Sequence, residues 1–273
     1  MRLPNWCRLD RGGVRFYSAW NFQSSGLVKH GFSTRIGGES LTPFDTLNLG
    51  LTVEDDKYSV LRNRRAFALA LGLDADRIVV PNQVHGKIVR LVTASDAGKG
   101  ALDHADSIPD TDALITNTPN LTLSLHFADC GSVFLLDPVN KAIGLVHSGW
   151  KGTAAKIVTE TIQAMVREFG SDPKKLLAAI GPSIGRCCYD VGEDVAMQLF
   201  KAFPHDERVI SRFSTGKWSA DLKMANLILL RNAGVEDSNI AISEHCTCCC
   251  PDEFFSYRRD GKTGRMGGWL SLC

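Results

Sequence analysis

Two short apolar runs on either side of a turn-forming cluster constrain the fold of this chain most strongly. The runs are Ser132–Leu136 and Ala142–Val146, and Asp137–Asn140 lies between them with the sequence Asp-Pro-Val-Asn. Residues of these types close β-hairpins. The sequence therefore predicts a hairpin whose open end carries Cys130 on one strand and His147 on the other.

This predicted hairpin brings two reactive side chains together. If Asp137–Asn140 forms the turn, Leu136 pairs with Lys141 and Cys130 lies opposite His147. Directly opposed residues of antiparallel strands have Cβ atoms about 4.5–5.5 Å apart. One metal ion could then bind both side chains, or His147 could deprotonate Cys130. A buried cysteine beside a capping histidine is the alternative, because cysteine is among the most often buried residue types.

Size and charge are typical of an ordinary globular protein. The chain has 273 residues, of which 44% are hydrophobic and 22% charged, with a net charge of +1. Such a balance gives no electrostatic reason to expect a nucleic acid or an acidic membrane surface as partner. No window of about 18 apolar residues exists, and Met1–Arg8 lacks the apolar core of a signal peptide, so we expect a cytoplasmic protein without a membrane partner. Without a repeat or linker, we expect a single domain over residues 1–273.

Apolar periodicity and turn residues predict the remaining elements. Residues 12–34 alternate in short runs, which indicates strands at the edge of a sheet. Helices are expected at 60–71, 153–169, 193–203 and 222–233, and further strands at 78–80, 88–92, 113–116, 121–127, 176–180 and 240–243.

Nine cysteines are many for a reducing compartment, but their number is odd and their spacing is clumped. Cys187 and Cys188 are adjacent, and four more lie within 246–250. Neither group resembles a disulfide framework or the paired spacers of a zinc ribbon. We interpret 246–250 as a partly buried, oxidation-prone strand end, because no second pair with matching spacing completes four metal ligands. Metal binding is the alternative.

His85 is the third candidate ligand. It lies beside Gly86 in a loop, where a histidine is accessible and usually only solvated. Together with Cys130 and His147 it would supply three nitrogen or sulfur ligands and leave a fourth position open, as in catalytic zinc sites. No spacing rule joins His85 to the hairpin, so the sequence leaves open whether the three residues meet.

Two segments are candidates for binding an anion. Gly37 and Gly38 can turn backbone N–H groups toward phosphate, and Arg35 adds a charged donor. A plain surface loop is the alternative. Arg258 and Arg259 follow a run of aromatic residues, which indicates a substrate-binding wall, with an exposed turn as the alternative.

Five segments, in this order along the chain, resemble the laccase-domain, or polyphenol-oxidase-like, family. They are Asn-Gln-Val-His-Gly at 82–86, Ala-Asp-Cys at 128–130, His-Ser-Gly-Trp-Lys-Gly at 147–152, Gly-Pro-Ser-Ile-Gly at 181–185 and Phe-Ser-Tyr-Arg-Arg-Asp-Gly at 255–261. The resemblance extends from about Gly31 to about Gly268. Members of this family are largely described as purine nucleoside phosphorylases.

The resemblance implies an α/β fold, a single-domain layered α/β/β/α sandwich with mixed sheets. It also implies zinc, with copper as the alternative, held by His85, Cys130 and His147. The implied reactions are phosphorolysis of adenosine, inosine, guanosine and methylthioadenosine and deamination of adenosine, so purine nucleosides and phosphate are the expected partners. Asp129 would orient a metal ligand or, equally, cap the turn. The sequence leaves the oligomeric state open.

Three other functions remain open. A cysteine hydrolase would use Cys130 as nucleophile and His147 or His85 as base. A related role suggested for some bacterial members is the editing of cell-wall precursors. A copper-dependent phenol oxidase is less favoured, because multicopper sites need many histidines and only seven are spread through the chain. A nucleotide-binding or partner-binding protein without turnover could use the same pocket.

Overall fold

The computed structural model describes residues 6–204, 206–212 and 216–273. The first five residues of Met1–Arg8, on which the prediction of a cytoplasmic protein partly rests, lie outside this part. Among the described residues, no helix combines the length and the apolar character that a bilayer span requires.

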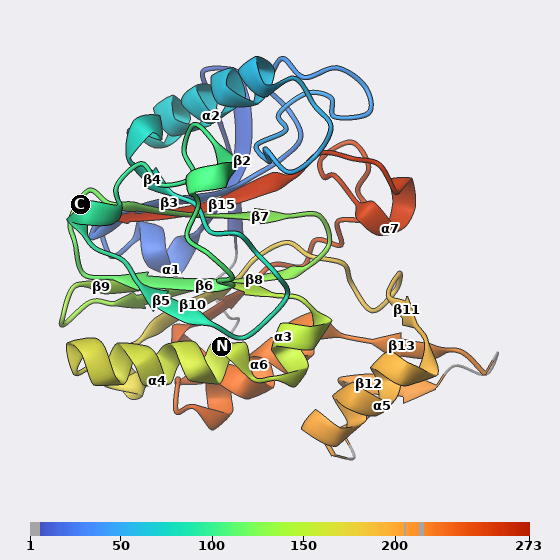
Figure 1. The fold of residues 1–273 in the computed structure, drawn as a ribbon. Coiled ribbons are helices and arrows are strands. Elements are labelled where there is room, and N and C mark those ends of the chain that lie inside the picture. Colours follow the sequence, from blue (N-terminus) through green and yellow to red (C-terminus); the bar gives the residue numbers. More distant parts are fainter. Residues whose placement is uncertain (1–5, 205, 213–215) are drawn as a thin grey trace.

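Two six-stranded mixed sheets form the centre of the molecule (Figure 1). The first sheet contains, in spatial order, β1 (Trp6–Arg11), β2 (Val14–Ala19), β3 (Val28–Ser33), β15 (Met266–Leu272), β7 (Thr122–Phe127) and β4 (Ile78–Val79). The second contains β14 (Ile240–Ile242), β10 (Leu177–Ile180), β8 (Gly131–Asp137), β9 (Ala142–Ser148), β6 (Ala113–Thr116) and β5 (Val89–Leu91). Both sheets are mixed, because β4 pairs in parallel with β7, β5 with β6, and β10 with β14, whereas the other pairs are antiparallel.

Helices cover the outer faces of both sheets (Figure 1). Helix α2 (Lys57–Leu71) packs Phe67 and Leu71 against the first sheet, around Trp269. Helices α4 (Ile157–Phe169) and α6 (Leu222–Asn232) pack against the second sheet. The remaining helices are α1 (Trp20–Gln23), α3 (Trp150–Ala154), α5 (Glu193–Ala202) and α7 (Tyr257–Asp260), and β11 (Asp190–Val191), β13 (Trp218–Ala220) and β12 (Ile210–Arg212) form a small third sheet.

A core between the two sheets holds the layers together. Phe134 and Leu145 of the second sheet and Leu125, Phe127 and Leu270 of the first belong to one cluster and are almost completely buried. Burying such side chains stabilises a fold by roughly 1.5–3 kcal/mol each. The predicted layered α/β/β/α sandwich with mixed sheets is therefore confirmed.

The predicted hairpin forms, but its register differs from the expected one. Strands β8 and β9 pair Asp137 with Ala142, so that Ser132, not Cys130, lies opposite His147. The turn comprises four residues after Asp137, whose carboxylate accepts hydrogen bonds from two turn amides. Lys141, with a φ of 50°, belongs to this turn, so the partner of each strand residue differs from the expected partner by two positions. A shift of two positions keeps every side chain on its expected face of the sheet.

Candidate metal centre and cavity

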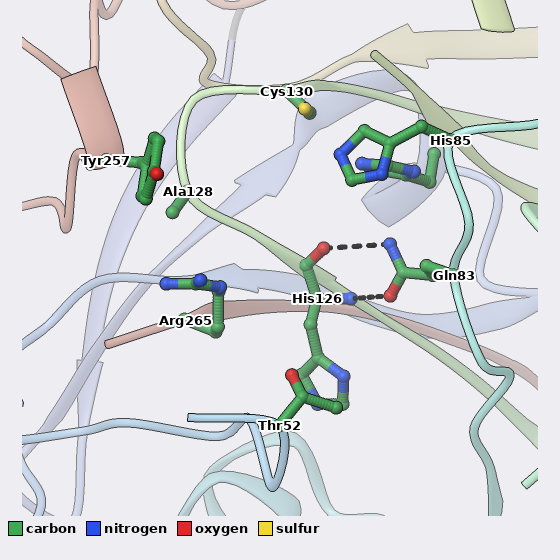
Figure 2. A pocket seen from close by; sticks show the side chains of 9 residues that line it. Thr52, Gln83, His85, His126, Ala128, Cys130, Tyr257 and Arg265 are labelled. Carbon is green, nitrogen blue, oxygen red and sulfur yellow. Dashed lines mark hydrogen bonds between the residues drawn. The ribbon is translucent and has the colours of Figure 1, made fainter. Parts of the chain in front are cut away.

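A cavity of 370 Å³ lies at the ends of β7, β8 and β9 (Figure 2). Volumes of this order are typical of small-molecule sites. Its lining residues come from several separate segments and are Thr52, Gln83, His85, His126, Ala128, Cys130, His147, Tyr257 and Arg265. Figure 2 shows Cys130 and His85 together on one side and Arg265 with Tyr257 on another, so that a molecule in the cavity would contact both groups.

The structure brings His85, Cys130 and His147 together. Each offers one ligand atom, and the three atoms lie within 4.8 Å of one another. The two imidazole rings are nearly perpendicular, with centroids 4.8 Å apart. His85 comes from the connection between β4 and β5, Cys130 from the turn between β7 and β8, and His147 from β9. Three such donors would leave one position of a four-coordinate metal open, as in catalytic zinc sites.

Asp112 organises this cluster, although the sequence analysis did not select it. The residue is completely buried, and its Oδ1 lies 2.8 Å from Nδ1 of His147. The same carboxylate accepts the backbone amides of His85 and Gly86 at 3.0 and 2.7 Å. It therefore leaves Nε2 of His147 available to a metal and fixes the loop that carries His85, whose φ is 59°. The only signal in the sequence is a carboxylate directly before the strand Ala113–Thr116.

The absence of a side chain at Gly149 leaves room for Cys130 and His85. A Cβ at this position would lie 3.1 Å from Sγ of Cys130 and 3.1 Å from Cδ2 of His85. Such distances are tighter than ordinary van der Waals contact, so a larger residue would push the donors apart. The space beside Gly149, the two imidazoles and the thiol suit a transition metal such as zinc, and the residues present therefore fit the metal that the family resemblance implies.

Mutual charge stabilises the cysteine and histidine in their ionised forms. Burial alone would raise the pKa of Cys130, but the charge of His147 and hydrogen bonds to both imidazoles outweigh it and lower the pKa to about 6. Burial alone would lower the pKa of His147, but the Cys130 thiolate and the Asp112 carboxylate raise it to about 9. A thiolate at neutral pH can bind a metal or act as a nucleophile.

The opposite side of the cavity contains a partly buried cation, Arg265, that the sequence analysis missed. Nη1 of Arg265 donates to the carbonyls of Thr263 and Gly264 at 2.8 and 3.1 Å, which fixes the guanidinium at the cavity. Burial lowers the pKa of Arg265, so an anion beside it would stabilise its charge. No sequence motif distinguishes this arginine from its neighbours, because its position depends on β15.

Gln83 connects the His85 loop to the first sheet. Its side-chain amide donates to the carbonyl of His126 at 3.0 Å and accepts the His126 amide at 2.8 Å (Figure 2). These two bonds imitate the pairing of a neighbouring strand at the end of β7. The His126 imidazole is partly buried, and desolvation together with the charges of Arg64 and Arg265 lowers its pKa. A neutral imidazole therefore lies in the cavity wall.

Asp129 is a positioning residue. Its carboxylate accepts hydrogen bonds from the Thr247 hydroxyl, the Ser256 hydroxyl and the Arg258 amide at 2.6, 3.0 and 2.7 Å. These contacts hold it at a φ of 89° in the turn before Cys130. Of the two roles that the sequence left open, the geometry favours anchoring the turn, because all three donors belong to other segments and none to a metal ligand.

The predicted phosphate loop lies away from the ligand cluster. Arg35 donates to Asp45 and to the carbonyl of Pro251 and lines a separate cavity. The amides of Gly37 and Gly38 both donate to the Thr46 hydroxyl at 3.1 Å. These donors are occupied by the protein itself, because the loop folds back on residues 45–46, so the structure does not bring them to a substrate at the cluster.

Arg258 and Arg259 are also occupied by backbone carbonyls. The Arg258 guanidinium donates to Asp190 at 2.7 Å and lies over the ring of Tyr189. The Arg259 guanidinium donates to the carbonyls of Thr247, Cys248 and Phe254. Arg258 lines a smaller cavity that Cys130 and Tyr257 also line. Residues 257–260 form the single helical turn α7, capped by Ser256, and three of its four residues are exposed.

A second cluster of potential metal ligands lies outside the cavity. The sulfur atoms of Cys187, Cys188, Cys246 and Cys249 lie within 4.8 Å of one another. The adjacent cysteines Cys187 and Cys188 thus meet two cysteines of 246–250, although their spacing does not match that of the segment. Strands β10 and β14 pair in parallel, which brings the loops that follow them to the same edge of the sheet. Sequence spacing cannot reveal such a meeting.

Several known proteins are similar to this chain in sequence and in fold. Residues 29–273 match the family described as multi-copper polyphenol oxidoreductase laccase. Purine nucleoside phosphorylase YlmD of Geobacillus stearothermophilus is 42% identical over 238 residues, covering 86% of this chain and 87% of that protein. Adenosine deaminase RL5, from an unknown prokaryotic organism, is 33% identical and covers 84% of this chain and 88% of that protein.

The solved structures agree with these sequence matches. The crystal structure of YlmD from Geobacillus stearothermophilus superposes with a TM-score of 0.92 at 38% identity, covering 98% of this chain and 99% of that one. The fold inferred from the family resemblance is thus found in an experimental structure. The protein belongs to the family described as multi-copper polyphenol oxidoreductase laccase.

Proposed function

We propose that this protein is a zinc-dependent purine nucleoside phosphorylase that cleaves adenosine, inosine, guanosine and methylthioadenosine and also deaminates adenosine. The observation that carries the proposal is the cluster of His85, Cys130 and His147, which faces Arg265 across one cavity. The relatives named purine nucleoside phosphorylase and adenosine deaminase support an enzymatic role for this site.

The three donors would hold the zinc ion, and Asp112 would fix the orientation of His147. A zinc ion bound there supplies Lewis-acid chemistry, which polarises a substrate oxygen or activates water. Cys130 then acts as a ligand and not as a nucleophile. The backbone amides bound to Asp112 keep His85 in place when substrate enters.

Arg265 is the proposed phosphate ligand, in place of Arg35. Its guanidinium is fixed beside the cavity, and an anion there would offset the cost of burying its charge. Tyr257, which lines the same cavity, offers an aromatic face to the purine. In phosphorolysis, a phosphate oxygen forms a bond to the anomeric carbon while the bond from that carbon to the purine nitrogen breaks. The purine nitrogen takes up the proton that the attacking hydrogen phosphate loses, and the purine leaves as the free base.

One assay tests the proposal. We expect about one zinc ion per chain to be lost in Cys130→Ala, and adenosine to yield adenine only when phosphate is present. Arg265→Met should raise the KM for phosphate at least tenfold, because a charge-assisted contact is lost. Arg35→Met is the matched control and should leave this KM unchanged. Formation of adenine without phosphate, or an unchanged KM in Arg265→Met, would contradict the proposal.

Deamination is tested in the same preparation without phosphate. Inosine should form from adenosine and should disappear in Cys130→Ala. Zinc and copper are measured together, since the ligand set alone admits both metals. Copper in place of zinc, with oxidation of phenols, would favour the phenol oxidase instead.

A cysteine hydrolase is the second candidate, and a specific arrangement favours it. Asp112, His147 and Cys130 form a chain of acid, base and thiolate, with 2.8 Å between Asp112 and His147. Such an arrangement activates a nucleophile when no metal is bound. Alkylation distinguishes the two functions. A nucleophilic Cys130 reacts at once, whereas a zinc-bound thiolate reacts only after chelation.

A further inference from the structure

Four cysteine sulfurs meet in a cluster that shares no residue with the proposed active site. Cys187 and Cys188 lie in the loop after β10, and Cys246 and Cys249 lie in the loop after β14. The Sγ atom of Cys249 lies 3.5 Å from Sγ of Cys187 and 3.3 Å from Sγ of Cys188. None of these cysteines forms a disulfide.

The distances between these four sulfurs are close to those around a single tetrahedral metal ion. Zinc binds thiolates at about 2.3 Å, so the sulfurs of a tetrahedral site lie about 3.8 Å apart and never beyond about 4.6 Å. The four sulfurs here lie within 4.8 Å of one another, close to that limit. Clusters with two or four irons bind their cysteines to different iron atoms and therefore spread the sulfurs more widely.

The backbone around the cluster is arranged for negatively charged sulfur. The amide of Gly185 donates to Sγ of Cys246 at 3.1 Å, and the amide of Cys188 donates to the Gly185 carbonyl at 3.0 Å. A Cβ at Gly185 would lie 3.2 Å from Sγ of Cys187, so a glycine lets the two loops close. Hydrogen bonds from amides to sulfur stabilise metal-bound thiolates.

A neighbouring cation adds to this stabilisation. The Lys223 ammonium donates to the carbonyl of His245, directly before the second loop. A zinc ion with four thiolates carries a net charge of −2, which a nearby positive charge offsets.

We propose that Cys187, Cys188, Cys246 and Cys249 bind one zinc ion in a tetrathiolate site that is separate from the proposed active site. This site joins the loops after β10 and β14. The zinc has four protein ligands and no open position, which is the pattern of a structural zinc site.

The position of this site connects it to the cavity. Thr247, between two of the ligands, donates to the carboxylate of Asp129 at 2.6 Å. The amide of Ile184, from the other loop, donates to the Asp129 carbonyl at 2.9 Å. Both loops thus hold the turn that carries Cys130. The tetrathiolate zinc therefore positions the wall of the proposed active site without contacting substrate.

Metal analysis of the reduced full-length protein tests this inference. We expect two zinc ions per chain in the wild type, one in Cys249→Ser, one in Cys130→Ala and none in the combined variant. Cys187→Ala is a second variant at an exposed position and should also hold one. Cys273→Ser, at an exposed position outside the cluster, is the control and should hold two.

Cobalt gives an independent readout. Cobalt-loaded Cys130→Ala should show the strong sulfur-to-metal charge-transfer absorption of four thiolates, and Cys249→Ser should lose most of that intensity. Unchanged zinc content in Cys249→Ser, or loss of all metal in Cys130→Ala, would overturn the inference. Iron in place of zinc in Cys130→Ala would overturn the assignment of the metal. Because Cys130→Ala removes only the other site, failure here is distinguishable from failure of the proposed phosphorylase.

Discussion

The carboxylate of Asp112 contacts both sides of the ligand cluster at once. One oxygen lies against Nδ1 of His147, and the other accepts the amide of Gly86. Carboxylates in this position fix the tautomer and raise the basicity of a metal-binding histidine. The same contact raises the pKa of His147 in the metal-free protein. Asp112 thus leaves Nε2 of His147 as the nitrogen that would bind a metal.

Asp112→Asn should weaken zinc binding about 10- to 100-fold, because an amide cannot replace the charge on the histidine. Competition with a chromogenic chelator measures this affinity. Asp110→Asn, two residues away at an exposed position with a φ of 45° that asparagine tolerates, is the matched control. Equal affinities in the two variants would show that the Asp112 carboxylate does not act on the metal.

Cys130 should titrate below the ordinary range of a thiol in the metal-free protein. Its folded pKa of about 6 lies below the unfolded value, so the thiolate contributes stability at high pH that is lost as the pH falls through about 6. His147, with a raised pKa of about 9, contributes stability at low pH that is lost as the pH rises through about 9. The thiolate–imidazolium pair therefore exists between these values.

Alkylation of the chelated protein measures this pair. The reaction at Cys130, followed by mass spectrometry of its peptide, should reach half its maximal rate near pH 6. A free peptide thiol, with a pKa of about 8.5, is the reference. A profile for Cys130 that matches the reference would mean that His147 does not stabilise the thiolate.

Helix α3 begins directly beside the ligand cluster, at Gly149. Gly149 caps this helix with a φ of −67° and a ψ of 171°, a conformation open to any residue. Gly149→Ala should therefore keep the fold and lower the zinc affinity at least tenfold, because the new Cβ would contact Cys130 and His85.

Gly192→Ala is the matched control for this prediction. Gly192 caps α5 with nearly the same backbone angles, and a Cβ there would meet only the flexible side chain of Asp194. Metal content and circular dichroism of both variants check the prediction. It fails if Gly149→Ala retains full zinc affinity, or if both variants lose zinc equally.

Apolar periodicity, helix caps and terminating glycines predict several of the helices and strands. The helix expected at 60–71 is α2, extended to Lys57 by its Asp56 cap and ended at Gly72. The strand expected at 113–116 is β6. The helix expected at 153–169 is instead two helices, α3 and α4, because Lys156 adopts a φ of 61°. A lysine does not indicate a left-handed backbone conformation, because that conformation is unfavourable for residues with a Cβ.

Strand β15 shows what local patterns miss. It lies at the centre of the first sheet, yet its residues include Gly267 and Gly268, which weaken any strand prediction. A Cβ at Gly268 would lie 2.9 Å from the ring of Phe127. The space beside both glycines is filled by neighbouring side chains, Leu49 and Trp269 at Gly267 and two phenylalanines at Gly268. Arg265 directly precedes this strand. Because the sequence did not predict the strand, it also gave no reason to place Arg265 at the cavity.

At the scale of the molecule, the proposed active site lies where the chain passes between the two sheets. His85 lies on the connection from β4 to β5, and Cys130 lies on the connection from β7 to β8. Each connection leaves the first sheet and enters the second. A metal bound to both, and to His147 of the second sheet, would link the two layers beyond their shared apolar core.

Zinc bound to the folded chain but not to the unfolded chain should therefore raise the unfolding temperature. At a free zinc concentration a thousand times the Kd, binding at one site contributes about 4 kcal/mol to the free energy of unfolding. For a chain of this size, that corresponds to a rise in Tm on the order of 10 °C. Scanning calorimetry of the wild type with and without a chelator measures the change.

The variants separate the two proposed sites in this measurement. Cys130→Ala retains only the proposed tetrathiolate, and Cys249→Ser retains only the proposed active-site ligands. Each should show a smaller chelator-dependent fall in Tm than the wild type, and the combined variant should show none. A wild type that holds two zinc ions but unfolds at the same temperature with and without chelator would mean that neither site couples metal binding to folding. Dependence on Cys130 alone would restrict that coupling to the connection between the sheets.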